Sequence, residues 1–343
     1  MNLKQHSLNL CFLCLTLGTA ASTPIDSLPN SFVAPSQSQA PESFKGYIRL
    51  DIENDMLVIR QKTDRYFTSG LKLDYFILKN PGEKFWFSKI FPRLKESDNF
   101  YGLTAASNMY TPANMSETML PGDRPYAGWA YIGLNNVSNN VSNNAETATR
   151  FSTEYTIGAI GPVVQQEKIQ TKWHEVIGRP APQGWKNQIA NDIALTLNFT
   201  GEKRLFKPAE YVDIIGLMEA NVGTVTNYMG FGGMVRVGWF DDYFHDIMQV
   251  KGKINKWQAY VYMRPQVRII ADNALLQGGV FTYYKSPYTI PRDDINRYYM
   301  NTEFGYSVTF RNLNVTYSQN IRTPEFKGAK NMFWGAMTFA FAL

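Results

Sequence analysis

A period-two alternation of apolar and polar residues constrains this chain more than any other feature. In segments 151–159, 229–239, 257–269 and 304–310, apolar side chains recur at every second position. Because successive side chains of a strand point to opposite faces, each segment predicts a strand with one apolar and one polar face. Strands of about ten residues with this pattern are typical of barrels that cross a membrane.

The last segment supports the same interpretation. In "FWGAMTFAFAL", residues 333–343, large apolar side chains alternate with small alanines. Aromatic residues make up 14% of the chain while the mean hydropathy is only −0.28, as expected when a single face of each strand meets lipid. A soluble β-sandwich or lipocalin-like barrel would also alternate, but the strand length and the aromatic last strand favour the membrane. We therefore predict an all-β fold, a transmembrane antiparallel β-barrel.

The first residues predict export from the cytoplasm. Residues 1–21 carry a single lysine, an apolar run at 8–17 and small residues at 18–21, which is the layout of a signal peptide. Both cysteines, Cys11 and Cys14, fall in this segment. The expected mature chain therefore has no disulfide, thiolate metal site or cysteine nucleophile.

Three segments are expected along the chain. They are the signal peptide 1–21, a flexible periplasmic lead-in 22–45 rich in Ser, Pro and Gln, and an outer-membrane β-barrel 46–343 with catalytic external loops. Loss of Lys4 with the signal peptide leaves 33 basic residues against 29 acidic ones, a net charge of +4. This weak excess predicts no nucleic-acid partner.

Twelve strands are predicted, and we expect a monomer. Their first residues are expected near Tyr47, Ser69, Phe100, Tyr126, Arg150, Asn191, Glu210, Tyr228, Lys256, Asn301, Leu313 and Phe333. An even number places both ends of the barrel on the periplasmic side and the connections after strands one, three and five outside. These external connections hold Asp55, Arg124 and His174, whereas His245 in "FDDYFHD" falls at the periplasmic end.

The connection over residues 161–189 is longer than a hairpin needs. Val164, Ile169, Trp173 and Ile177 with the intervening polar residues suit an amphipathic helix, and "GRPAP" ends the pattern. Long loops on a rigid scaffold are where binding and catalytic residues usually lie. We therefore predict a helical external loop with a functional role.

The first hairpin is expected to gather polar side chains at the external rim. Asn54 and Asp55 end the first strand and Thr68 begins the second. Amide and carboxylate oxygens suit Ca²⁺, to which Thr68 can add a hydroxyl, and His174 can act as a general base. The same residues would also suit two ordinary strand ends and a surface histidine, and composition does not separate the two interpretations.

Three motifs in this order resemble the outer-membrane lipid A 3′-O-deacylase family, LpxR-like. They are "ENDM" followed by "TDRYFTSGLKL", then "GDRPYAGW", then "GPVVQQEKIQTKWHEVIG". The resemblance covers most of the expected mature chain. It implies a twelve-stranded barrel, an active site between the barrel wall and a helix of an external loop, and a requirement for Ca²⁺. By position, Asn54, Asp55 and Thr68 match the family's functional asparagine, aspartate and threonine, while Gln170 and His174 match its glutamine and histidine one helical turn apart.

Two departures from the family pattern bear on substrate contacts. The loop "MYTPANMSETMLPGDR" lacks the basic residues that characterised members place there, and the family's glutamate six residues after the histidine is Pro180 here. Arg124, Lys172 and Arg179 are therefore the candidate substrate-binding residues, because basic side chains form charge-assisted contacts with phosphate.

The reaction expected from the resemblance is hydrolysis of an ester-linked (3′-acyloxyacyl) fatty acid of lipid A. Its expected mechanism resembles that of secreted phospholipase A2. His174 would draw a proton, directly or through a second water, from the water that attacks the ester carbonyl. Ca²⁺ held by Asn54, Asp55 and Thr68 would stabilise the oxyanion. Gln170, at i−4 from His174, would orient the histidine or the water. The expected partner is lipopolysaccharide in the outer leaflet of the bacterial outer membrane.

Three alternatives come from other functional classes. A barrel phospholipase of the serine type is disfavoured because no G-x-S-x-G motif or His-x-Ser strand pair is present. A barrel protease could use His245 and the acids of "FDDYFHD", although these lie at the periplasmic end. A passive pore would need an open lumen and no catalysis.

Overall fold

The computed structural model describes the barrel and most of its connections. The described residues are 46–59, 65–79, 86–115, 121–140, 148–245, 247 and 257–343. The expected signal peptide and lead-in, residues 1–45, lie outside this range and stay predictions.

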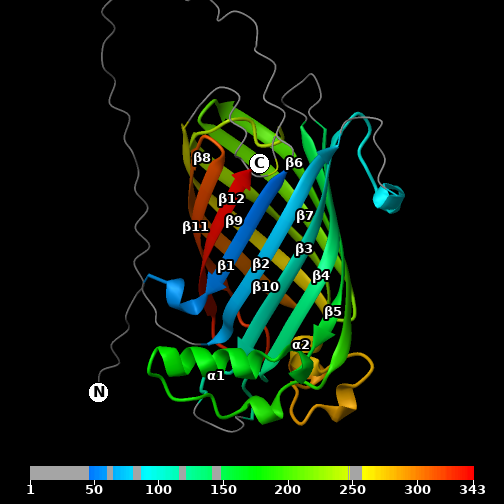
Figure 1. Cartoon of the computed structure of the whole chain (residues 1–343), viewed down its shortest axis with the longest axis vertical. Helices are drawn as coiled ribbons and strands as arrows, with labels where there is room; N and C mark the ends of the chain where they lie inside the picture. The colour runs from blue at the N-terminus through cyan, green and yellow to red at the C-terminus, as the bar shows by residue number, and fades with distance from the viewer. Residues whose placement is uncertain are drawn as a thin grey trace, which may run out of the picture. The chain divides into compact units, whose positions relative to one another are not determined.

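Twelve antiparallel strands close into a barrel in which each strand pairs with its neighbours in sequence and β1 pairs with β12 (Figure 1). The strands are β1 Tyr47–Asn54, β2 Tyr66–Lys79, β3 Asp98–Thr111, β4 Ala127–Asn140, β5 Thr149–Ile160, β6 Asp192–Ala209, β7 Val212–Gly223, β8 Thr226–Trp239, β9 Trp257–Asn273, β10 Tyr298–Phe310, β11 Leu313–Arg322 and β12 Met332–Ala342. The predicted fold class and strand number are confirmed, and every predicted first residue lies within three positions of the observed one.

Neighbouring register rows show how the alternation builds the wall. Leu103 of β3 pairs with Leu134 of β4, and Leu103 is 56% exposed on the outer face. In the next row, Thr104 pairs with Gly133, which pairs with Thr156 of β5, and both threonines are buried. Apolar side chains therefore cover the outside of the wall, and small polar side chains line the inside.

Charged side chains inside the barrel are paired with one another. Lys72 Nζ lies 2.7 Å from Glu154 Oε1, and the buried Asp213 carboxylate lies between Arg204 and Arg236. Cavities of about 170, 260 and 280 Å³ lie between such side chains. Because an unpaired buried charge is costly, these contacts stabilise the charged side chains inside the barrel.

The helical elements belong to the connections. The α-helices are α1 Gln166–Val176 and α2 Ala274–Gln277, and the 3₁₀ turns are η1 Asp55–Leu57, η2 Trp86–Ile90, η4 Pro162–Val164, η5 Trp185–Asn187, η6 Tyr283–Lys285 and η7 Arg292–Asp294. Both α-helices lie at the end of the barrel opposite the chain's C-terminus, at the lower end of Figure 1. That end is external if the first and last strands begin and finish on the periplasmic side. Within the described ranges, no helix is both long and apolar enough to cross a membrane.

We predict that the folded barrel resists SDS until it is heated. The β1–β12 pairing closes the strand ladder, so no strand edge is open to detergent. Unheated protein should migrate differently from boiled protein on a gel and should give a β-rich circular dichroism spectrum. A helix-dominated spectrum would contradict the barrel.

Candidate active site

The β1–β2 hairpin brings the first set of polar residues to the external rim. Asn54 pairs with Ser69, and the ladder between β2 and β3 shifts its register at Thr68. Asn54 caps the following 3₁₀ turn because its Oδ1 accepts a hydrogen bond of 2.7 Å from Met56 N. Asp55, the first residue of that turn, is only 2% exposed. The expected gathering of Asn54, Asp55 and Thr68 at one rim is therefore observed.

The second set comes from α1, which follows β5 through Gly161. Gly161 has φ +94°, and a Cβ there would lie 2.7 Å from the backbone of Ala190, so a glycine fits this turn. The predicted helix is confirmed, but its buried side is polar, since Gln166, Gln170 and His174 are buried. These three residues follow an i, i+4, i+8 spacing and share one face of the helix.

The apolar side of α1 points away from the barrel interior. Ile169 is 54% exposed and Trp173 is 51% exposed. A helix that lies at the boundary between a barrel and lipid can expose apolar residues because its outer surroundings are apolar. The sequence periodicity therefore located the helix correctly, and the structure adds that its polar row faces the protein.

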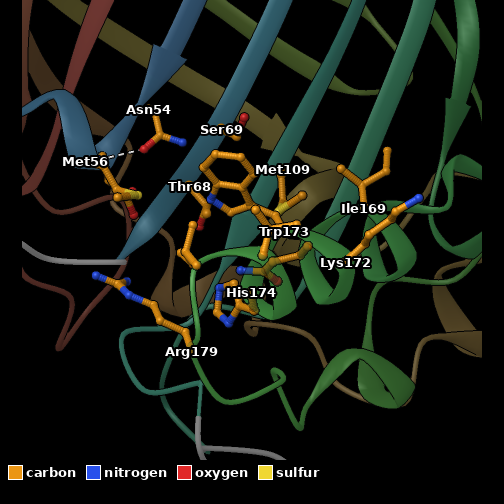
Figure 2. Close-up of a pocket in the computed structure, with 14 residues that line it drawn as sticks. Asn54, Met56, Thr68, Ser69, Met109, Ile169, Lys172, Trp173, His174 and Arg179 are labelled. Atoms are coloured by element: carbon orange, nitrogen blue, oxygen red, sulfur yellow. Dashed lines mark hydrogen bonds between the residues drawn. The ribbon is translucent and has the colours of Figure 1, made fainter.

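A pocket of about 560 Å³ lies between α1 and the rim of β1–β3 (Figure 2). Asn54 and Thr68 approach it from the strands, while Trp173 and His174 approach it from the helix. Its lining residues are Asn54, Asp55, Met56, Thr68, Ser69, Met109, Ile169, Gln170, Lys172, Trp173, His174, Val176, Ile177 and Arg179. The lining combines a few polar groups with apolar side chains, as expected of a site for an amphiphilic molecule.

A hydrogen bond to the backbone orients His174. The ring Nδ1 lies 2.6 Å from the carbonyl oxygen of Pro180, and His174 is 6% exposed. Because a carbonyl oxygen can only accept, Nδ1 carries the hydrogen, and Nε2 of the neutral ring keeps its lone pair. In the neutral ring, this hydrogen bond selects the tautomer that can accept a proton at Nε2.

A buried tryptophan determines how the Gln170 amide is turned. Trp185 Nε1 donates a hydrogen bond of 2.7 Å to Gln170 Oε1, and Gln170 Nε2 lies 3.2 Å from Met115 Sδ. Trp185 is 1% exposed, and its ring centre lies 4.8 Å from the ring centre of Tyr126 in the "GDRPYAGW" motif. An indole N–H can only donate, so the amide oxygen must face Trp185 and the amide nitrogen must face away from it.

The oxygen-bearing side chains at the rim are chemically suited to a hard cation. Asp55 offers a carboxylate, Asn54 an amide oxygen, and Thr68 and Ser69 offer hydroxyls, all lining the same pocket. Thr68 Oγ1 is also 2.7 Å from Thr111 Oγ1. Among the described residues no three His, Cys, Asp or Glu side chains cluster as metal ligands. This donor set fits Ca²⁺ with one side-chain carboxylate and the remaining positions open to water or substrate oxygens.

The three basic candidates do not share one place. Lys172 and Arg179 line the pocket, but Arg124 is 2% exposed and lines a separate cavity inside the barrel. Its guanidinium forms an ion pair with Glu325 and lies 4.4 Å from the centre of the Tyr110 ring. The structure therefore does not bring Arg124 to the pocket. The carboxylate of Glu325, in an external loop, holds its guanidinium inside the barrel.

The Arg124 ion pair links two external connections. Glu325 lies between β11 and β12, and Arg322 Nη1 is 3.0 Å from its other carboxylate oxygen. Burial opposes ionisation of Glu325, but Arg124 and Arg322 outweigh it and hold the pKa of this carboxyl below its usual range. The "GDR" motif thus contributes to the rigidity of the rim.

His245 lies at the opposite end of the barrel, in the connection after β8, as predicted. It is 44% exposed, and its Nδ1 is 3.7 Å from Asp242 Oδ1. Asp242 also pairs with Arg204 at 2.9 Å. Burial opposes ionisation of Asp242, yet hydrogen bonds from His245 and Arg204 hold the pKa of its carboxyl well below its usual range. A carboxylate held in this way is a poor base, which disfavours the protease alternative.

Sequence reasoning missed several residues that support the site. Trp185 and Met115 lie outside the three motifs, and Ser69 lies within "TDRYFTSGLKL" with no predicted role beyond beginning a strand. Pro180 enters the sequence prediction only as a departure from the family pattern. Trp185 acts through its buried indole and Met115 through a thioether contact. Ser69 acts through its pairing with Asn54, and Pro180 through its main-chain carbonyl. A lone tryptophan after "PQG" in a polar loop was the single visible signal.

Comparisons with known proteins agree with this architecture. A family model described as "Outer membrane protein LpxR" matches residues 10–343. The solved structure of LpxR from Salmonella typhimurium matches with a TM-score of 0.67 at 19% identity, covering 87% of this chain and 100% of that one. The match to a bacterial polysaccharide outer membrane secretin covers 88% of this chain and 100% of that chain at 7% identity. Its TM-score of 0.31 is too low to indicate a shared fold. No curated protein matches the chain.

Proposed function

The chain belongs to the LpxR family of outer membrane proteins, and from that premise we propose that it is a Ca²⁺-dependent lipid A deacylase. The proposed reaction hydrolyses the ester of a 3′-acyloxyacyl chain of lipid A in the outer leaflet. One observation carries the proposal. The basic histidine on α1 and the oxygen donors of the β1–β2 rim line the same largely apolar pocket on the external end of a membrane barrel.

The base in this proposal is His174. Its Nε2 accepts a proton from water, and the water oxygen forms a bond with the ester carbonyl carbon. The tetrahedral intermediate then breaks its bond to the sugar oxygen, which takes the proton from Nε2. The products are a free fatty acid and a hydroxyl on the sugar. The hydrogen bond from Nδ1 to Pro180 supports this role because it favours the tautomer with a free Nε2.

Asp55, Asn54 and Thr68 are the residues that would hold Ca²⁺. When bound, the cation would supply positive charge beside the oxygen of the reacting carbonyl. Asp55 would supply the only carboxylate of the set, so its charge should dominate the affinity.

Gln170 is proposed to present its amide N–H₂ to the same oxygen. Its Oε1 is already occupied by Trp185 Nε1, and the thioether of Met115 is a weak acceptor for Nε2. Trp185 does not line the pocket, so it is a positioning residue that acts through Gln170. Lys172 and Arg179 are proposed to contact the lipid A phosphates, because both are exposed cations at the pocket.

The first prediction compares the two histidines. His174→Ala should lower deacylation by about 10²–10⁴-fold because it removes the general base. His245→Ala, at the other end of the barrel, should retain nearly parental activity. The measurement is mass spectrometry of lipid A from cells that carry each variant, with heat-modifiable migration as the folding control. Equal losses in both variants would contradict the assignment.

The second prediction concerns the cation. Chelation should abolish deacylation and added Ca²⁺ should restore it. Asp55→Asn keeps the shape of the side chain but removes its charge, so it should require far more Ca²⁺ for half-maximal activity. A Ca²⁺ titration of purified parent and variant measures this shift. A titration curve unchanged in Asp55→Asn would show that the carboxylate does not hold the metal.

The third prediction tests the Trp185–Gln170 contact by a double-mutant cycle. Trp185→Phe keeps an aromatic ring beside Tyr126 but removes the N–H, so kcat should fall while KM changes little. In the Gln170→Ala background the same substitution should cost nothing further, whereas in the Lys172→Ala background it should keep its full cost.

Gln170→Glu provides an independent check of the amide direction. A carboxylate can still accept from Trp185, but it replaces the proposed N–H₂ donor by an oxygen. Loss of an oxyanion donor costs about 10²-fold or more in kcat, so this variant should be as inactive as Gln170→Ala. An active Gln170→Glu enzyme, or full additivity in the cycle, would disprove the donor role.

A further inference from the structure

The connection between β9 and β10 presents a cluster of exposed apolar side chains at the external end of the barrel. Val280, Phe281, Tyr283 and Tyr284 are 56%, 58%, 63% and 68% exposed. None of them lines the pocket described above. We call residues 278–285 the aromatic tongue, and neither the fold nor the proposed reaction accounts for it.

The tongue is fixed to the first residue of β6 by a dense set of hydrogen bonds. Asp192 Oδ2 accepts from Phe281 N at 2.8 Å and from Thr282 N at 2.9 Å. Thr282 Oγ1 also donates to the Asn191 carbonyl oxygen at 2.7 Å. These contacts hold the backbone of the tongue against the start of β6 while its large side chains remain exposed.

Two glycines permit this close approach. A Cβ on Gly279 would lie 2.2 Å from Asp192 Oδ2, and Gly278 has φ +90°, which disfavours any side chain. The exposed aromatic residues are therefore held on a specific backbone that requires glycine at two positions.

The tongue continues the exposed apolar outer face of the barrel wall. Asp192 Oδ1 accepts a hydrogen bond of 2.7 Å from the backbone N–H of Ile193. Ile193 is 55% exposed and, with Leu195 two residues further along β6, belongs to the outer face of the wall. The exposed side chains of the tongue thus begin where the lipid-facing side chains of β6 end.

The composition of the tongue fits the boundary between acyl chains and head groups. Tyrosine and phenylalanine are enriched at both edges of membrane barrels, where a ring can contact acyl chains and a hydroxyl can contact water. Lys285 places its Nζ 5.6 Å from the Tyr284 ring centre, so a cation that suits lipid phosphates follows the aromatic residues.

We propose that the aromatic tongue inserts into the head-group boundary of the outer leaflet and anchors the external rim at a fixed depth. Its occupant is the lipid bilayer itself, and this assignment does not depend on the reaction proposed above. An anchor on the β9–β10 connection, together with the half-exposed apolar side of α1, would fix the rim against the outer leaflet on two sides.

The absence of cysteine after residue 14 permits a direct test with single spin labels. Nitroxide labels are placed by Val280→Cys and by Tyr283→Cys in the purified mature chain, which is reconstituted into phosphatidylethanolamine–phosphatidylglycerol vesicles. Val222→Cys on the outer face of β7 is the lipid reference, and Lys327→Cys in the β11–β12 connection is the water reference. Heat-modifiable migration confirms that each labelled protein is folded.

The measurement is relaxation of each label by oxygen, which concentrates in lipid, and by a water-soluble nickel chelate. Labels in the tongue should show an oxygen-to-nickel accessibility ratio between those of Val222→Cys and Lys327→Cys, and clearly above the latter. A ratio equal to that of Lys327→Cys would place the tongue in water and overturn the proposal. Low access to both reagents would indicate contact with another protein copy and would also overturn it.

Discussion

Closure of the strand ladder is the constraint on which the rest of the structure depends. A bilayer offers no hydrogen-bond partner to a strand edge, so β1 must pair with β12 before the wall can be stable in lipid. Closure also creates a lumen, into which every second side chain of each strand points, and most of these side chains are polar. The lumen then holds charged groups such as Lys72 and Glu154, which stabilise each other only when they are paired.

The pocket lies at the external rim of the barrel. There the strand ladder ends, and backbone and side-chain groups no longer need to satisfy the geometry of the sheet. The register shift at Thr68 and the 3₁₀ turn at Asp55 both occur at this edge. The helix α1 then covers the edge from outside and adds Gln170 and His174, so the pocket lies between the helix and the rim of the barrel.

Much of this arrangement could be predicted from sequence, because it depends on the two-residue period of the strands and on the even number of strands. Alternation located the strands, the even strand number separated His174 from His245, and the spacing of Ile169 and Trp173 located the helix. The direction of the helix could not be predicted in the same way. In water its apolar side would be buried, but next to lipid the polar row that contains Gln170 faces the protein. Arg124 shows the same limit, since its buried partner Glu325 is 201 residues away.

His174 is oriented by a main-chain carbonyl rather than by a side chain. The family resemblance places a glutamate at position 180, where this chain has proline. The Pro180 carbonyl oxygen nevertheless lies 2.6 Å from His174 Nδ1. A carbonyl can fix the tautomer as a carboxylate does, but it adds no negative charge to stabilise an imidazolium. In the proposed mechanism, the reaction would therefore depend more on the charge of Asp55 and on the orientation of Gln170 than it would with an additional carboxylate, and Trp185 would act by holding Gln170.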